Sequence, residues 1–113
     1  MKSLESTVAF TALLEQSPLV LAYFTGGTCA ACAVIGQAVE EIVAEFPQAR
    51  AMEIPAAQYR ALAASYDVFA VPTAILFVQG REALRFGRHV DLGDFRRRLA
   101  RYHQLICDSC DRY

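Results

Sequence analysis

Four cysteines are the residues of this chain whose type and spacing best suit chemistry, and they form two pairs. Cys29 and Cys32 enclose two alanines, whereas Cys107 and Cys110 enclose an aspartate and a serine. Two thiols at this spacing can form a reversible disulfide, or they can supply half of a four-cysteine zinc site. The elements predicted around each pair therefore decide which chemistry is available.

The first pair lies where a predicted buried strand changes into a predicted helix. The apolar run at residues 19–25 comes before it, Gly26 and Gly27 break that run, and helical periodicity begins near Cys32. The free amides and dipole of a helix N-terminus stabilise a thiolate, and they commonly lower a cysteine pKa from about 8.5. We therefore expect Cys29 to attack a substrate disulfide and Cys32 to resolve the mixed disulfide.

A zinc ion held by all four cysteines is one alternative, and the chain between the pairs argues against it. Residues 33–106 separate them, which is well beyond the spacing of common zinc ribbons. The last predicted helix leads away from Cys29, and from Leu92 to Cys107 it spans roughly 22 Å at 1.5 Å per residue. We therefore expect no metal site and no site shared by the two pairs within one molecule. Unreactive structural thiols are the other alternative for the first pair.

The second pair follows the last predicted helix. We place Cys107 and Cys110 in a short C-terminal tail, residues 107–113, after a single domain of residues 1–106. Chain ends are usually mobile. A flexible pair can close its own disulfide and act as a secondary redox pair between molecules, bind a soft metal, or have no role. The sequence leaves these alternatives open.

The elements that must position the first pair alternate between helices and strands. The apolar periodicity predicts helices over residues 7–16, 32–46, 56–66 and 92–106, and strands over residues 19–25, 50–54, 73–78 and 81–86. The unbroken apolar runs among these strands are typical of the centre of a sheet covered on both faces. Asp91 is expected to cap the last helix, and Gln79-Gly80 to form a tight turn. This order predicts an α/β fold: a mixed four-stranded sheet with helices on both faces.

Size and charge exclude several classes of function. The 113 residues fit one domain, the 55% hydrophobic composition supplies a core, and the net charge of −1 does not indicate a nucleic-acid partner. No apolar run reaches the ~20 residues of a membrane-spanning helix, and Glu5 interrupts any signal-peptide core. We therefore expect a cytoplasmic protein without nucleic-acid or membrane partners.

Taken together, these motifs resemble the thioredoxin superfamily over about residues 5–106. Cys29-Ala-Ala-Cys32 is followed later in the chain by Val71-Pro72-Thr73, which opens a predicted strand, and then by Gly80 and Gly87. The resemblance implies a thioredoxin-like fold and a thiol–disulfide oxidoreductase that uses its own cysteines and no cofactor. It also implies protein disulfides or dithiols as substrates, and an electron donor similar to thioredoxin reductase.

The resemblance further implies a substrate groove beside the first pair. In the family, a cis-proline lies against the dithiol, which implies a cis bond between Val71 and Pro72. The backbone before that proline pairs with an extended substrate chain, so Val71 would take this role. Gly87 and Arg88 would form the other wall of the groove, and Thr28 would adjoin the substrate directly before the first cysteine.

Several positions depart from the family pattern. Thr28 replaces a tryptophan, two alanines replace Gly-Pro between the cysteines, Tyr23 replaces a buried aspartate, and Ala51 replaces the lysine that accompanies it. A tyrosine, with an ordinary pKa near 10, is a poor base at neutral pH. We therefore expect Tyr23 to pack in the core, while water or another group accepts the proton of Cys32.

These departures keep a second hypothesis open. The chain could be a thioredoxin-fold binding module, a chaperone or assembly factor whose groove is intact and whose redox activity is vestigial. The presence of both Cys29 and Cys32 argues against this alternative.

Overall fold

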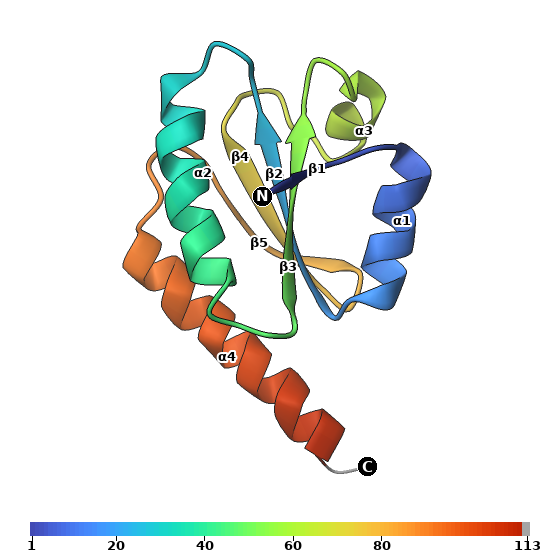
Figure 1. Cartoon of the computed structure of the whole chain (residues 1–113), viewed down its shortest axis with the longest axis vertical. Helices are drawn as coiled ribbons and strands as arrows, with labels where there is room; N and C mark the ends of the chain where they lie inside the picture. Colours follow the sequence, from blue (N-terminus) through green and yellow to red (C-terminus); the bar gives the residue numbers. More distant parts are fainter. Residues whose placement is uncertain (112–113) are drawn as a thin grey trace.

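The computed structural model describes the backbone of residues 1–111 and the side chains of residues 1–107. In chain order the elements are β1 (Lys2–Ser3), α1 (Thr7–Gln16), β2 (Leu19–Thr25), α2 (Ala30–Val43), β3 (Ala49–Pro55), α3 (Arg60–Ser65), β4 (Thr73–Val78), β5 (Arg81–Phe86) and α4 (Leu92–Asp111). A central sheet separates α2 and α4 on one face from α1 and α3 on the other (Figure 1). The predicted α/β architecture is confirmed.

The sheet has five strands rather than the predicted four, in the order β1-β3-β2-β4-β5. Strands β1, β3 and β2 are parallel, and β4 and β5 are each antiparallel to the strand before them in this order. The additional strand is β1, in which Lys2 and Ser3 pair with Met52 and Glu53. Both β1 residues are exposed, so no apolar alternation marks this strand in the sequence.

Strand β2 lies at the centre of the sheet, and every one of its residues is buried. Its alternate side chains face opposite sides. Leu19, Leu21 and Tyr23 join the core under α2 and α4. Val20, Ala22 and Phe24 join the core under α1 and α3. The two-sided burial explains why β2 is an unbroken apolar run, and it makes β2 a rigid base for the cysteine motif that follows.

Helices α2 and α3 do not have the predicted bounds, and α2 ends at Val43 rather than at residue 46. Helix α2 begins at Ala30 because Cys29 itself caps it, although cysteine is not among the usual capping residues. Helix α3 covers only Arg60–Ser65 instead of 56–66. The amides of Gln58 and Tyr59 both donate to the carbonyl of Pro55, so this stretch forms turns before the helix begins.

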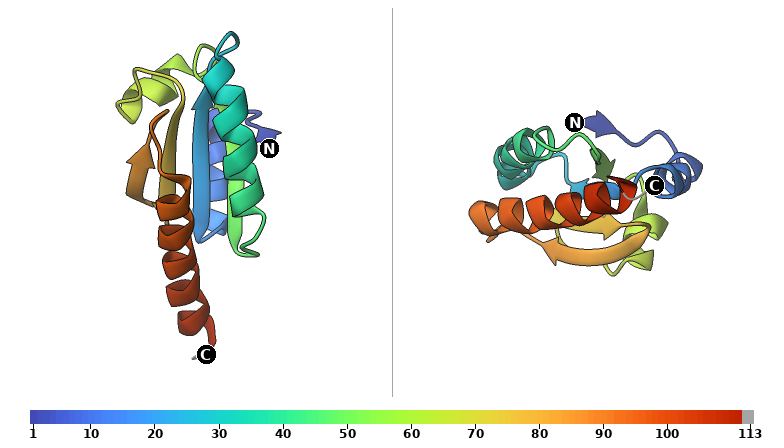
Figure 2. Two further views of the ribbon diagram at one scale, coloured as in Figure 1. Left: turned by 90° about the vertical axis from the view of Figure 1, so that its left-hand side faces the viewer. Right: turned by 90° about the horizontal axis from the view of Figure 1, so that it is seen from below.

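The final helix continues past its predicted end. Asp91 caps α4 as expected, because its Oδ1 accepts a hydrogen bond of 3.0 Å from the Asp94 amide. The helix then runs to Asp111 and extends beyond the end of the sheet (Figure 2). The predicted end of this helix at residue 106 is therefore wrong, while the division into a domain of residues 1–106 and a tail of residues 107–113 stays a prediction; residues 112–113 lie outside the described residues. Neither proline nor glycine occurs in 107–111 to end the helix.

Candidate active site

The first cysteine pair occupies the connection between the carboxyl end of β2 and the start of α2. A turn carries the chain between them, in which the Cys29 amide donates to the Gly26 carbonyl at 3.3 Å. Thr28 lies in this turn and is exposed. Cys29 has an extended backbone and stands at the N-cap position of α2. The pair therefore lies where the helix presents unbonded amides.

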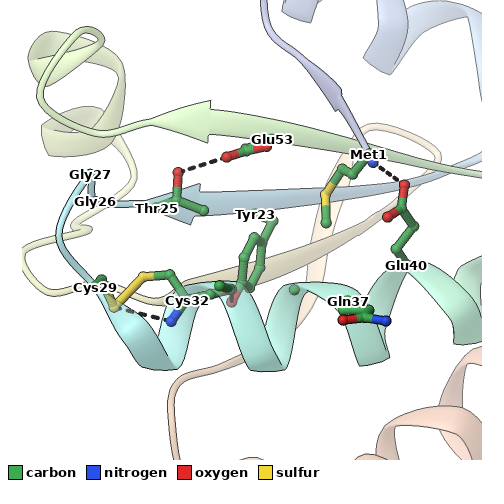
Figure 3. A pocket seen from close by; sticks show the side chains of 12 residues that line it. Met1, Tyr23, Thr25, Gly26, Gly27, Cys29, Cys32, Gln37, Glu40 and Glu53 are labelled. Carbon is green, nitrogen blue, oxygen red and sulfur yellow. Dashed lines mark hydrogen bonds and ion pairs between the residues drawn. A yellow bond between two sulfur atoms is a disulfide. The ribbon is translucent and has the colours of Figure 1, made fainter.

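Cys29 and Cys32 are joined by a disulfide, with their Cα atoms 5.2 Å apart (Figure 3). The two residues differ in accessibility, because Cys29 is partly exposed and Cys32 is 4% exposed. The Cys32 amide donates a hydrogen bond of 3.1 Å to Cys29 Sγ. In the reduced state such a donor favours negative charge on the accepting sulfur. The geometry thus distinguishes an accessible cysteine with an amide donor from a shielded one.

Tyr23 lies beneath the first turn of α2 and is 1% exposed. Its hydroxyl donates a hydrogen bond of 2.8 Å to the Cys32 carbonyl, and its ring would lie 3.0 Å from a Cβ placed on Gly36. Burial, together with the charge of Glu53, raises the pKa of Tyr23 above its ordinary value. Tyr23 therefore packs as expected and ties the cysteine-bearing turn to the sheet.

The segment before β4 lies beside the cysteine turn. The Val71–Pro72 peptide bond is cis. A Cβ placed on Gly26 would lie 3.0 Å from Val71 Cγ2 and 3.9 Å from Cys29 Cβ, so Val71 and Cys29 flank this glycine. A Cβ placed on Gly87 would lie 3.4 Å from the Pro72 carbonyl oxygen. The structure thus brings together residues that are far apart in the sequence.

Arg88 lies on the loop that follows β5. It is exposed in a turn closed by a 3.2 Å hydrogen bond from the Val90 amide to the Gly87 carbonyl. Its loop therefore adjoins the cis-proline through Gly87.

A pocket of about 320 Å³ opens beside the two cysteines. Its lining includes Met1, Tyr23, Thr25, Cys29, Cys32, Gln37, Glu40 and Glu53. Sequence reasoning missed Glu53 as part of this site. In the sequence, Glu53 is marked only by being a charged residue within a predicted strand. The pairing of β3 with β2 then shows that Glu53 lies directly beside Tyr23.

The second cysteine pair lies far from this site. The N-terminal end of α2 and the C-terminal end of α4 are at opposite ends of the molecule (Figure 1). Cys107 is partly buried, with its Sγ 3.7 Å from His103 Nδ1. The side chain of Cys110 lies outside the described residues, so its predicted pairing stays a prediction. Among the described residues, no three His, Cys, Asp or Glu side chains form a group that could hold a metal ion.

The described part of the chain contains no helix that combines the length and the apolarity needed to cross a membrane. On the surface, Arg96 of α4 forms an ion pair with Glu45, which follows the end of α2, and Arg98 forms one with Asp94 within α4.

Residues 2–101 match the thioredoxin family. The chain is 27% identical over 105 residues to the thioredoxin-like protein YdfQ of Bacillus subtilis (strain 168), covering 93% of this chain and 94% of that protein. A mutant thioredoxin from Halobacterium salinarum NRC-1 has a similar structure, with a TM-score of 0.81, 24% identity and coverage of 90% of this chain and 89% of that one. Fasciola hepatica thioredoxin gives a TM-score of 0.77 at 25% identity, covering 90% of this chain and 99% of that one.

Proposed function

This chain belongs to the thioredoxin family, and from that premise we propose that it exchanges dithiols and disulfides with protein substrates through Cys29 and Cys32. The observation that carries the proposal is the bridged pair at the start of α2, with one accessible and one buried cysteine. This arrangement supports a thiol–disulfide oxidoreductase role. The alternative of a binding module with vestigial redox activity is not favoured, because both sulfurs are present and within bonding distance.

In the reducing direction the reaction has two displacement steps. The Cys29 thiolate attacks one sulfur of a substrate disulfide, which forms a mixed disulfide and releases the first substrate thiolate. Cys32 then loses its proton and attacks Cys29 Sγ, which forms the Cys29–Cys32 disulfide and releases the second thiolate. Two electrons pass from the dithiol to the substrate, and both released thiolates take up protons. The bridged state of the structure is the product of this sequence.

The accessible position of Cys29 suits it to the first step. The Cys32 amide, which donates to Cys29 Sγ, stabilises a thiolate there, and the α2 dipole acts in the same direction. Cys32 is shielded from substrates by its burial, so its sulfur is reached from Cys29 rather than from solution. These two properties support Cys29 as the attacking residue and Cys32 as the resolving residue.

The surface beside the pair, around Val71 and Pro72, is proposed to hold an extended substrate segment. The backbone of Val71 would pair with that segment, as in strand addition. Pro72 and Gly87 lie next to each other, and Arg88 and Thr28 are exposed on the two neighbouring turns. An electron donor similar to thioredoxin reductase would use the same accessible sulfur to restore the dithiol.

Reduction of insulin by dithiothreitol tests this function. We expect the wild type to accelerate insulin precipitation and Cys29→Ser to abolish the acceleration. The matched control is Cys107→Ser, which removes a thiol at the other end of the molecule and should retain the full rate. An equal rate for Cys29→Ser and the wild type would overturn the proposed function.

A further inference from the structure

The resolving step of the proposed function raises a question about protons. Cys32 attacks only as a thiolate, yet this residue is buried, and burial disfavours the charged form. Efficient resolution therefore needs a nearby group that accepts the thiol proton. Among the described residues, the candidates are the polar groups that share the pocket with Cys32.

Tyr23 is the polar group that contacts the Cys32 residue directly, but it does not suit this role. Its hydroxyl already donates its proton to the Cys32 carbonyl. Its pKa is raised by burial and by Glu53, so Tyr23 holds its proton throughout the neutral range. Tyr23 is therefore a structural donor rather than a base.

Glu40 does not suit the role either. It lies two turns further along α2, roughly 12 Å from Cys32 at 1.5 Å of helix rise per residue. Its carboxylate also forms an ion pair with the N-terminal ammonium of Met1, at the opposite side of the pocket (Figure 3). The position and the partner of Glu40 both direct it away from the sulfurs.

Glu53 is the remaining carboxylate of the pocket, and its position is favourable. It pairs in register with Tyr23 on the neighbouring strand, so both side chains lie on the sheet face that α2 covers. Strands β2 and β3 are parallel, and Glu53 is close to the same carboxyl edge that carries the cysteines. The hydroxyl of Thr25 donates to Glu53 Oε1 at 3.3 Å, which directs the carboxylate toward the cysteine end of the pocket (Figure 3).

We propose that the Glu53 carboxylate accepts the proton of Cys32, through a water molecule in the pocket, as Cys32 attacks the mixed disulfide. The pocket volume of about 320 Å³ has room for water, and hydroxyl and carboxylate groups line it. The Cys32 Sγ–H bond breaks, the Cys29–Cys32 bond forms, and the substrate thiolate departs with the electron pair of the broken disulfide. Protonated Glu53 then returns its proton to solvent. This role rests on the proposed function.

A two-phase reaction separates this role from the first step. The reduced protein, with Cys107→Ser and Cys110→Ser as background, is mixed with 5,5′-dithiobis(2-nitrobenzoic acid) in a stopped-flow instrument. The first release of coloured thiolate reports the attack by Cys29, and the second release reports the resolution by Cys32. Glu53→Gln keeps an oxygen to accept from Thr25 but cannot take a proton.

We expect Glu53→Gln to leave the rate of the first release unchanged and to slow the second release about tenfold. This is less than the roughly hundredfold or more that a general base usually contributes. Glu53→Asp should restore most of the second rate, because it restores the carboxylate. Glu40→Gln is the matched control and should change neither phase.

The pH profile of the second release provides a readout that a packing role would not move. The charged and titratable groups facing the pocket are Tyr23 on β2, Glu53 on β3, Glu40 on α2 and the Met1 ammonium, besides the cysteines. The pH at which the second release reaches half of its maximal rate should rise in Glu53→Gln, because Cys32 must then lose its proton without the carboxylate, and it should stay unchanged in Glu40→Gln. A second release in Glu53→Gln that matches the background in rate and profile would overturn the role of Glu53 alone. Absence of a Cys29-dependent first release would overturn the proposed function and this role together.

Discussion

The two cysteine motifs of this chain share their spacing but differ in their position within a helix. Cys29–Cys32 begins α2, where Cys29 caps the helix and accepts from an amide. Cys107 lies inside α4, where backbone amides already bond to carbonyls of the preceding turn, and its sulfur has His103 as a neighbour. The place of a C-x-x-C motif in the fold, and not its spacing alone, therefore sets which groups surround its sulfurs.

Alkylation of the reduced protein by iodoacetamide offers the largest contrast between the two motifs. We expect Cys29 to be labelled at least about tenfold faster than Cys107 at neutral pH, because a helix N-terminus raises the thiolate fraction. Cys32 should react last because of its burial. Peptide mass spectrometry of timed samples measures the three rates. If Cys32 or Cys107 reacts before Cys29, the assigned roles are wrong.

The close packing around the first motif can be tested at its glycines. Gly26→Ala places a methyl group 3.0 Å from Val71 Cγ2, whereas a methyl group at Gly27 meets open space. We expect Gly26→Ala to lower the free energy of unfolding by about 2 kcal/mol and to slow insulin reduction. Gly27→Ala should stay within about 0.5 kcal/mol of the wild type. Chemical denaturation measures both, and equal effects would show that Val71 does not adjoin the turn.

Tyr23→Phe removes the hydrogen bond that ties the first motif to the sheet. We expect the free energy of unfolding to fall by about 1 kcal/mol, because the hydroxyl that ties β2 to Cys32 is lost. The raised pKa of Tyr23 means that its contribution is fully present below the unfolded pKa near 10 and is lost as the pH rises through the folded value. Denaturation curves above and below pH 10 should therefore converge for the two proteins in alkali. A constant difference would contradict the buried, protonated tyrosine.

The smallest effect is expected at the second motif. Replacing Cys107 and Cys110 with serine should leave the equilibrium potential of the first pair unchanged, because the two helix ends lie at opposite ends of the molecule. The partly buried Cys107 should make the change in unfolding free energy no larger than about 0.5 kcal/mol. A glutathione titration of the monomeric variant measures the potential. A clear shift would indicate that the two motifs communicate within one molecule.

The sequence predicted the elements that have strong local signals. Helix α1 and strands β2, β4 and β5 have the expected bounds because Ser17-Pro18 and Gln79-Gly80 interrupt long apolar patterns. Gln79 and Gly80 both have positive φ, as a tight hairpin turn requires. By contrast, β1 could not be predicted, because backbone pairing holds two exposed residues there.

The candidate site shows the same division. Cys29 and Cys32 were predicted from their place between a strand and a helix. Glu53 was not, because its position depends on the register of β3 against β2 and on its contact with Thr25. Long-range register of this kind leaves no signal in the local sequence. A residue such as Glu53, which joins the site through strand pairing, is therefore harder to predict than the cysteines of a local motif.

The equilibrium potential of the Cys29–Cys32 couple tests the central claim most directly. The protein with Cys107→Ser and Cys110→Ser is equilibrated with glutathione buffers, and the oxidised fraction is measured after thiol trapping. We predict a single two-electron transition between about −270 and −120 mV, the range of exchange-active dithiols, because Cys29 is accessible and its thiolate has an amide donor. A disulfide that stays oxidised below about −300 mV, as structural disulfides do, would contradict this account.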